Sequence, residues 1–226
     1  MSDIPAGERD GGSARSEPAA MRNREPILAV LRPLLEDPAT PAGAVVETAA
    51  GHGIHACFLA PHFPVRPWLA TEREPDNVAV IAERVAGVPT TAQASLRAPL
   101  RIDVGAPDWA AVVAAHLAGD RPVAAILNVN MIHIAPWEAG LGLLAGAGKL
   151  LAPGGVLYLY GPYRVGGAHT GPGNVAFDQS LRARDPAWGI RDLDDVTAAA
   201  AAHGLQRAAV IAMPADNLSV VFRRTS

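Results

Sequence analysis

The feature that most constrains this chain is a short apolar strand that runs directly into a turn of small residues. The strand covers Ala44–Thr48, and the turn that follows it reads Ala49-Ala-Gly-His-Gly53. A second apolar stretch, residues 67–72, ends on the carboxylate of Glu72. This order is typical of a βαβ unit that binds an adenosine group, because glycines let backbone N–H groups approach the ligand and the distant acid accepts hydrogen bonds from ribose hydroxyls. The turn holds only two glycines, so the pattern by itself is a weak signal.

Composition narrows the class of protein. The chain has 226 residues, of which 50% are apolar and 18% charged, as expected for an ordinary globular domain. A formal net charge of −3 provides no bulk attraction to nucleic acid or to an anionic membrane. The single cysteine, Cys57, excludes a disulfide framework and a multi-cysteine zinc site. No apolar run reaches membrane-spanning length and no signal-peptide pattern is visible, so we expect a cytoplasmic protein.

The order of the expected elements begins with a change of pattern near residue 20. Residues 1–20 lack periodicity and are rich in small and polar residues, which predicts a disordered leader before a single domain over residues 21–226. Apolar residues then recur at helical spacing and predict an amphipathic helix over residues 25–36. Further helices are expected at 54–60, 75–85, 108–118, 136–151, 173–184 and 192–203, and strands at 44–48, 67–72, 100–104, 124–130, 156–160, 208–213 and 218–222.

The alternation of these elements predicts the fold class. Strands that are continuous apolar runs, each followed by a helix, indicate a parallel sheet covered on both faces. Only Pro214-Ala-Asp216 separates the last two strands, which is too short for a crossover and therefore predicts an antiparallel hairpin. We expect an α/β fold whose mostly parallel, seven-stranded sheet ends on a C-terminal antiparallel hairpin, with helices on both faces.

This arrangement resembles the Rossmann-like fold of class I S-adenosylmethionine-dependent methyltransferases, and the turn Leu151-Ala-Pro-Gly-Gly155 is frequent in that fold. Four further segments are more distinctive, and they resemble the DUF938 (UPF0585) family of methyltransferase-like proteins. The segments are 130–137, 160–163, 177–189 and 213–218. The resemblance extends over roughly residues 23–224 and implies the same fold, with S-adenosylmethionine as the cofactor.

The resemblance also assigns roles at the carboxyl edge of the sheet. It implies that Glu47 supports the methionine part of the cofactor or the turn, that Glu72 binds the ribose, and that Asp103 contacts the adenine amino group. The residues alone leave simpler interpretations open, namely a surface glutamate, a solvated charge run and a helix N-cap. The residues expected to bind the cofactor are Asn23, Arg24, Glu47, Ala49, Gly51, His55, Glu72, Arg73, Asp103, Val104, Asn128 and Asn130.

The residues of this set that precede the first helix carry their own alternative. Arg24 and its neighbours precede the first helix and can reach the cofactor's carboxylate, since a guanidinium offers a planar fork to that group. The alternative is a helix that only packs on the sheet, with its arginines in solvent.

The turn departs from the family's Glu-x-Gly-Ser-Gly-Thr-Gly pattern, because Ala49 replaces the first glycine and His52 the threonine. Glu72 stands where the family usually has Asp.

The candidate catalytic residues follow the fourth and fifth strands. Asn130 and His133 lie at the edge that faces the transferred methyl group in the class of enzymes this chain resembles, where a histidine can remove the acceptor's proton. The alternative for His133 is a buried structural histidine between two isoleucines. Tyr163 and His169 belong to a glycine-rich stretch, residues 161–173, which is either a substrate lid or only a flexible loop. The histidines at 52, 55 and 62 lack carboxylate partners, so we expect no metal site.

Three functions stay open at this point. The first is transfer of a methyl group to a small-molecule acceptor. The second uses the same cofactor for cyclisation or aminocarboxypropyl transfer, releasing 5′-methylthioadenosine. The third is a non-catalytic binding protein. We expect a small-molecule partner and neither a nucleic acid nor a membrane, and a homodimer is compatible with the sequence.

Overall fold

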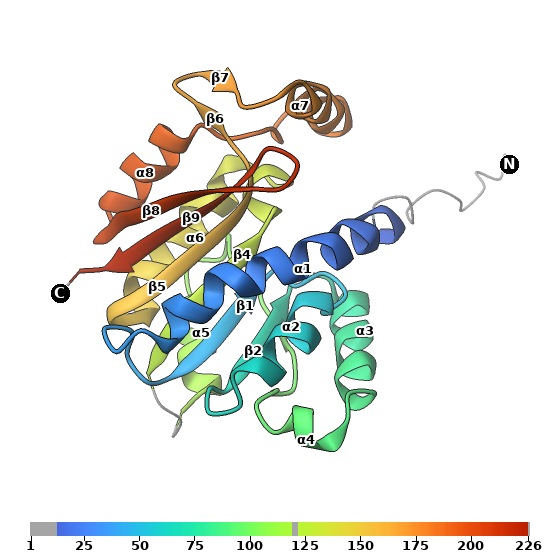
Figure 1. The fold of residues 1–226 in the computed structure, drawn as a ribbon, viewed down its shortest axis with the longest axis vertical. Coiled ribbons are helices and arrows are strands. Elements are labelled where there is room, and N and C mark those ends of the chain that lie inside the picture. The colour runs from blue at the N-terminus through green and yellow to red at the C-terminus, as the bar shows by residue number, and fades with distance from the viewer. Residues whose placement is uncertain (1–12, 119–121, 226) are drawn as a thin grey trace, which may run out of the picture.

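A seven-stranded sheet runs through the molecule and carries helices on both faces (Figure 1). The computed structural model describes residues 13–118 and 122–225. The strand order is β3-β2-β1-β4-β5-β9-β8, in which β9 pairs antiparallel with both of its neighbours. The strands are β1 (Ala44–Thr48), β2 (Trp68–Glu72), β3 (Leu100–Arg101), β4 (Val123–Val129), β5 (Leu151–Pro162), β8 (Leu205–Met213) and β9 (Asn217–Arg224). The predicted mostly parallel sheet with a C-terminal antiparallel hairpin is therefore confirmed.

Successive residues of each strand face opposite layers, as the pleat of a strand requires. Val45 belongs to the apolar core under α1, α2 and α3, whereas Val46 belongs to the core under α5, α6 and α8. Because both faces are covered at the centre of the sheet, the central strands are mainly apolar. The helices are α1 (Ser13–Glu36), α2 (Ile54–Leu59), α3 (Pro75–Ala86), α4 (Thr90–Gln93), α5 (Trp109–His116), α6 (Trp137–Leu150), α7 (Pro172–Arg184) and α8 (Leu193–Ala201), with short 3-10 turns η1 (Ala60–His62) and η2 (Met131–His133).

Helix α1 begins at Ser13, well before the predicted start, so residues 13–20 are helical where the sequence predicted a disordered leader. Residues 1–12 of that leader lie outside the described part of the chain. The earlier start has a tertiary cause, because Glu17 pairs with the His52 ring at 3.0 Å and with the Arg84 guanidinium at 3.0 Å. These contacts hold the N-terminal half of the helix against the glycine turn.

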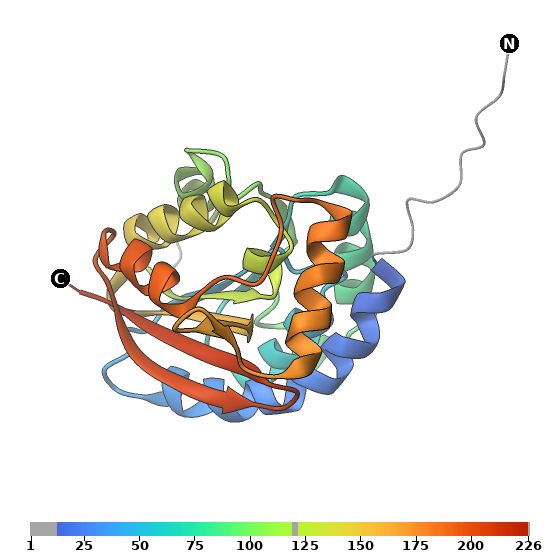
Figure 2. The ribbon, with the colours of Figure 1, turned by 90° about the horizontal axis from the view of Figure 1, so that it is seen from above.

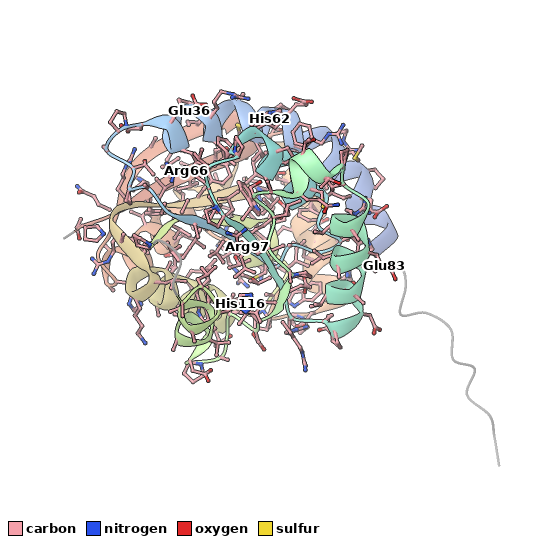
Figure 3. All side chains as sticks on the ribbon, turned by 90° about the horizontal axis from the view of Figure 1, so that it is seen from below. Glu36, His62, Arg66, Glu83, Arg97 and His116 are labelled. Carbon is pink, nitrogen blue, oxygen red and sulfur yellow. The ribbon has the colours of Figure 1, made fainter. Side chains whose placement is uncertain are left out.

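The other end of α1 is anchored at the opposite end of the molecule. The Arg66 guanidinium donates a hydrogen bond of 2.9 Å to the carbonyl of Pro41 and another to the carbonyl of Leu35 (Figure 3). Ile27 and Leu31 are fully buried against the sheet between these two anchors. The helix therefore crosses the face of the sheet that it shares with α2 and α3, and its N-terminal half reaches the glycine turn at the carboxyl end of β1.

One predicted strand and one predicted loop differ in detail from the observed structure. Strand β3 ends at Arg101 rather than at residue 104, because the Asp103 carboxylate accepts the Gly105 N–H at 2.8 Å and turns the chain out of the sheet. The glycine-rich stretch 161–173 contains a small hairpin of β6 (Arg164–Val165) and β7 (Ala168–His169), after which α7 begins. Figure 2 shows α7 and the N-terminal half of α1 on the same side of the molecule.

Candidate functional site

The turn after β1 and the end of β2 hold each other in place. The Gly51 N–H donates to Glu72 Oε2 at 2.8 Å, and the Arg73 N–H donates to the other oxygen, Oε1, at 2.8 Å. Glu72 is only 8% exposed, so the interpretation of this residue as part of a solvated charge run is excluded. That interpretation does fit Arg73, whose exposed side chain pairs with Glu74 at 2.9 Å. The acid predicted at the ribose therefore also fixes the turn.

The backbone of the turn is left-handed at three residues, Ala49, Gly51 and Gly53. A Cβ atom added at Gly51 would meet nothing within 4 Å, so this glycine opens onto free space. Ala49 adopts φ 51°, a conformation that costs an L-residue about 1–2 kcal/mol. The substitution of alanine for the family's first glycine therefore strains the turn and leaves its shape intact.

Glu47 is buried beneath the turn at 1% exposure, which rules out a surface glutamate. The indole Nε1–H of Trp68 donates to Glu47 Oε2 at 3.2 Å. Burial raises the pKa of the Glu47 carboxyl to about 8, with a smaller upward contribution from Glu72 and an opposing one from the Trp68 hydrogen bond. The carboxyl is therefore mainly protonated at neutral pH and can donate as well as accept a hydrogen bond.

The end of β4 presents two asparagines. Asn128 is buried, and its Nδ2 donates to Thr48 Oγ1 at 3.0 Å, while its Oδ1 has no hydrogen-bond partner among the residues the structure describes. Asn130 follows in a left-handed conformation that asparagine tolerates, and its N–H donates to the Tyr160 carbonyl at 2.8 Å. A Cβ added at Gly161 would lie 3.1 Å from Asn130 Oδ1. Asn128 thus lies beside the start of the glycine turn, and Asn130 lies beside the end of β5.

The His133 ring differs in its tautomer and its pKa from what a general base requires. The ring is fully buried, and Nδ1 accepts the Arg191 N–H at 3.2 Å, so the proton of the neutral ring lies on Nε2. Burial, followed by the nearby Arg191 charge, lowers its pKa to about 3. A group with this pKa and this tautomer is a poor proton acceptor at neutral pH and a good hydrogen-bond donor. The ring also packs edge-on against Tyr163, with 4.8 Å between centroids.

Tyr163 and His169, the other predicted catalytic residues, lie on the same side of the fold as His133. Tyr163 is fully buried, and burial raises the pKa of its hydroxyl above the ordinary tyrosine value. His169 lies on β7 with Nε2 3.5 Å from Asp178 Oδ2. The predicted lid is therefore a folded hairpin that carries a histidine–carboxylate pair.

The remaining predicted residues are spread around the turn and β3. His55 is buried at the start of α2, where burial lowers its pKa to about 4, and the Arg24 guanidinium lies 4.6 Å from the Phe58 ring centre on the same helix. Asn23 is half-buried on α1. Val104 is buried in the core beside α5, which makes it a packing residue. At the ends of β2 and β3, a shallow depression is lined by Arg73, Glu74, Arg101 and Asp103.

Several residues of this region were not predicted from the sequence. Glu17 was missed because it fell in the predicted leader, although Ala19 and Ala20 after it favour a helix. Asp178 and Arg191 contact the predicted residues His169 and His133 only through the tertiary fold. Within residues 13–118 and 122–225, no group of three or more His, Cys, Asp or Glu side chains is arranged to hold a metal ion. No helix in that part of the chain is long and apolar enough to cross a membrane.

Known structures share this fold. An O-methyltransferase family protein from Burkholderia thailandensis superposes with a TM-score of 0.72 at 14% identity, over 95% of this chain and 60% of that chain. A Planctomyces limnophilus O-methyltransferase family 2 protein in complex with apigenin gives 0.67 at 17% identity, over 92% and 65%. Human N-acetylserotonin methyltransferase in complex with S-adenosylmethionine gives 0.66 at 13% identity, over 99% and 61%.

These neighbours define the class: the chain has the Rossmann-like fold of class I S-adenosylmethionine-dependent methyltransferases. It spans less than two thirds of the length of each of these proteins. Its own family is narrower. Over residues 14–224 the chain matches the family described as a protein of unknown function (DUF938), and it belongs to that family.

Proposed function

We propose that this protein binds S-adenosylmethionine at the carboxyl edge of β1, β2 and β4 and transfers its methyl group to a small-molecule acceptor in the cytoplasm. The observation that carries the proposal is the contact between the Gly51 N–H and Glu72, beside the open space above Gly51. This contact lies where ligands bind in open α/β sheets, at the carboxyl ends of strands on either side of the turn.

The residues present fit this cofactor. Glu72 uses its two oxygens for backbone N–H groups and keeps lone pairs that can accept from ribose hydroxyls. Asn128 Oδ1 and His55 Nε2 are buried and have no hydrogen-bond partner within the described chain. Since such atoms cost about 1–3 kcal/mol each when left unpaired, they are suited to the polar groups of a bound ligand.

The chemistry of the chain follows from these positions. When bound, the cofactor supplies an electrophilic methyl group on a sulfonium. The chain must align the acceptor with that group and exclude water, which requires positioning more than covalent help. In this proposal Gly51 and Glu72 hold the ribose side, Arg24 and His55 face the methionine carboxylate, and Asn128 and Asn130 orient the reacting end.

Calorimetric titration with S-adenosylhomocysteine tests the binding step. We expect the wild-type protein to bind and Glu72→Gln to weaken binding by about tenfold, because an amide loses the charge and part of the accepting capacity. Glu83→Gln is the matched control, since that glutamate is exposed on α3 and does not line the depression at the ends of β2 and β3. Absence of binding to the wild-type protein would refute the proposal and favour a non-catalytic binding protein.

Product analysis tests the reaction. The protein is incubated with S-adenosylmethionine and a protein-free small-molecule extract of cells, and the nucleoside products are separated by chromatography. Release of S-adenosylhomocysteine supports methyl transfer. Release of 5′-methylthioadenosine above the uncatalysed background would instead indicate cyclisation or aminocarboxypropyl transfer.

A further inference from the structure

A second polar region lies beyond the ends of β4 and β5, on residues far apart in the sequence. The Gly189 N–H donates to the His133 carbonyl at 3.0 Å, and the Arg164 N–H donates to the Arg191 carbonyl at 3.0 Å. His169 is the partner of Arg164 across the β6–β7 hairpin. These contacts join η2, the hairpin and the segment after α7 into one unit. We call it the polar cluster; its members are His133, Tyr163, Arg164, His169, Asp178 and Arg191.

Asp178 determines which nitrogen of His169 carries the proton. Its Oδ1 accepts the Ile190 N–H at 2.7 Å and its Oδ2 accepts from Arg182 Nε at 3.2 Å. Burial alone would raise the pKa of Asp178, but these bonds outweigh burial and hold it below the ordinary value. The carboxylate is therefore ionised, and its Oδ2 lies 3.5 Å from His169 Nε2, which favours the tautomer that carries hydrogen on this nitrogen. Nδ1 is left with a lone pair.

Four atoms of the polar cluster are buried without a hydrogen-bond partner in the described part of the chain. They are His133 Nε2, Tyr163 Oη, Arg164 Nε and His169 Nδ1. Native proteins pair nearly all such atoms, so a group of them is suited to binding a polar ligand. By the tautomers derived above, His133 and Arg164 offer donors, Tyr163 a hydroxyl, and His169 an acceptor.

The charges of this region select among ligands. The guanidinium groups of Arg164, Arg182 and Arg191 belong to the polar cluster or pair with it. Asp178 balances the charge of Arg182, so a protonated amine would be repelled by the two remaining cations and would bring donors to a site that already offers mainly donors. Both the positive charge and the excess of hydrogen-bond donors favour an oxygen that carries negative charge.

We propose that the polar cluster binds the acceptor of the methyl transfer, that this acceptor is a small hydroxyl compound methylated on oxygen, and that His169 is its catalytic base with Asp178 as positioning residue. This inference rests on the proposed function. The acceptor O–H proton moves to His169 Nδ1, and the imidazolium formed is stabilised by the Asp178 carboxylate. The oxygen forms a bond to the methyl carbon, while the carbon–sulfur bond breaks and leaves its electron pair on sulfur. His133 Nε2–H and Arg164 Nε–H stabilise the charge on the oxygen until transfer is complete.

Imidazole ¹⁵N NMR tests the role of Asp178 without any ligand. Signals are assigned by comparison with His169→Gln. We expect His169 to be protonated on Nε2 in the wild-type protein and on Nδ1 in Asp178→Asn, because an amide N–H group would face the ring. Asp194→Asn, an exposed carboxylate on α8, is the control. A wild-type ring protonated on Nδ1, or an unchanged tautomer in Asp178→Asn, overturns the assignment. If Asp178→Asn does not fold, the wild-type spectrum alone tests the assignment.

Titration with two small ions tests the acceptor class. Sodium acetate carries the expected charged oxygen, and methylammonium chloride is the matched cation at equal ionic strength. We expect acetate alone to shift the imidazole signals of His133 and His169 saturably, with about tenfold weaker binding in Arg164→Gln. Arg207→Gln, on the outer strand β8, should behave like the wild-type protein. Equal shifts by both ions, no saturable acetate shift, or no loss in Arg164→Gln overturns the oxygen acceptor.

These outcomes are separable from those of the proposed function. Binding of S-adenosylhomocysteine depends on the glycine turn and Glu72, whereas the NMR measurements need no cofactor. A protein that binds the cofactor but fails the acetate test retains the proposed function and loses the oxygen acceptor. A protein that binds acetate but not the cofactor loses the proposed function.

Discussion

The two halves of the candidate site are built differently. The proposed cofactor half consists of a turn and a strand end that are close in sequence, and its central contact joins a backbone N–H of Gly51 to Glu72. The proposed acceptor half consists of side chains from segments widely separated in sequence, such as His133 and Arg191. Backbone contacts within one βαβ unit leave a recognisable sequence pattern, whereas side-chain clusters assembled from distant segments do not. The two halves should also respond to pH in opposite directions, because burial raises the pKa of Glu47 and lowers the pKa of His133.

The largest expected effect is the pH dependence of stability in the cofactor half. The pKa of Glu47 is raised to about 8 in the folded protein, so the unfolded chain loses this proton at lower pH than the folded one. Folding stability should therefore fall as pH rises from about 5 to 8, at up to about 1.4 kcal/mol per pH unit. Urea denaturation of the wild-type protein and Glu47→Gln across this range measures the difference. Parallel curves for the two proteins would show that Glu47 is ionised in the folded state.

The acceptor half should respond in the opposite direction. The pKa of His133 is lowered to about 3, so below pH 6.5 the unfolded chain binds a proton that the folded protein excludes. Relative to His133→Gln, the wild-type protein should lose about 2 kcal/mol of stability between pH 6.5 and 5. His116→Gln, an exposed position on α5, serves as the control (Figure 3). The prediction fails if wild type and His133→Gln keep a constant stability difference over this range.

A substitution at Gly161 should damage the acceptor half and spare the cofactor half. A Cβ at this position would lie 2.8 Å from His133 Nε2 and Cδ2 inside a packed region. We expect Gly161→Ala to lower the free energy of unfolding by about 1–3 kcal/mol while leaving the affinity for S-adenosylhomocysteine within about twofold. Gly173→Ala is the matched control, because a Cβ there meets nothing within 4 Å. A parallel loss of cofactor affinity in Gly161→Ala would mean that the two halves are mechanically coupled.

The smallest expected effect concerns strain in the glycine turn. Ala49→Gly should stabilise the protein by up to about 1 kcal/mol, since relief of the left-handed alanine exceeds the entropy cost of glycine. Ala50→Gly, one residue later and without a positive φ, should destabilise it by about 0.5–1 kcal/mol or more. Chemical denaturation of both variants gives the comparison. A loss of stability in Ala49→Gly would show that the turn is not strained at this residue.

The sequence predicted the fold in most of its parts. Strand and helix positions follow from apolar periodicity, and the hairpin of β8 and β9 follows from the short Pro214-Ala-Asp216 connection. The errors fall where local pattern and tertiary contact disagree. Ser13–Ala20 lack a helical pattern strong enough to predict a helix, and Glu17 is held by residues of the turn and of α3. The predicted strand 100–104 is shortened by the Asp103–Gly105 hydrogen bond, which apolar periodicity does not reveal.

What the sequence determined by itself is the sheet, its hairpin and the position of the glycine turn opposite Glu72, because these depend on local backbone geometry and on which faces are apolar. What only the tertiary structure decided is the chemical state of the functional groups. Glu47 is mainly protonated at neutral pH because it is buried, and His133 is a donor because the Arg191 N–H occupies Nδ1. Desolvation and hydrogen-bond partners set both states, and each depends on residues that only the folded chain brings into contact.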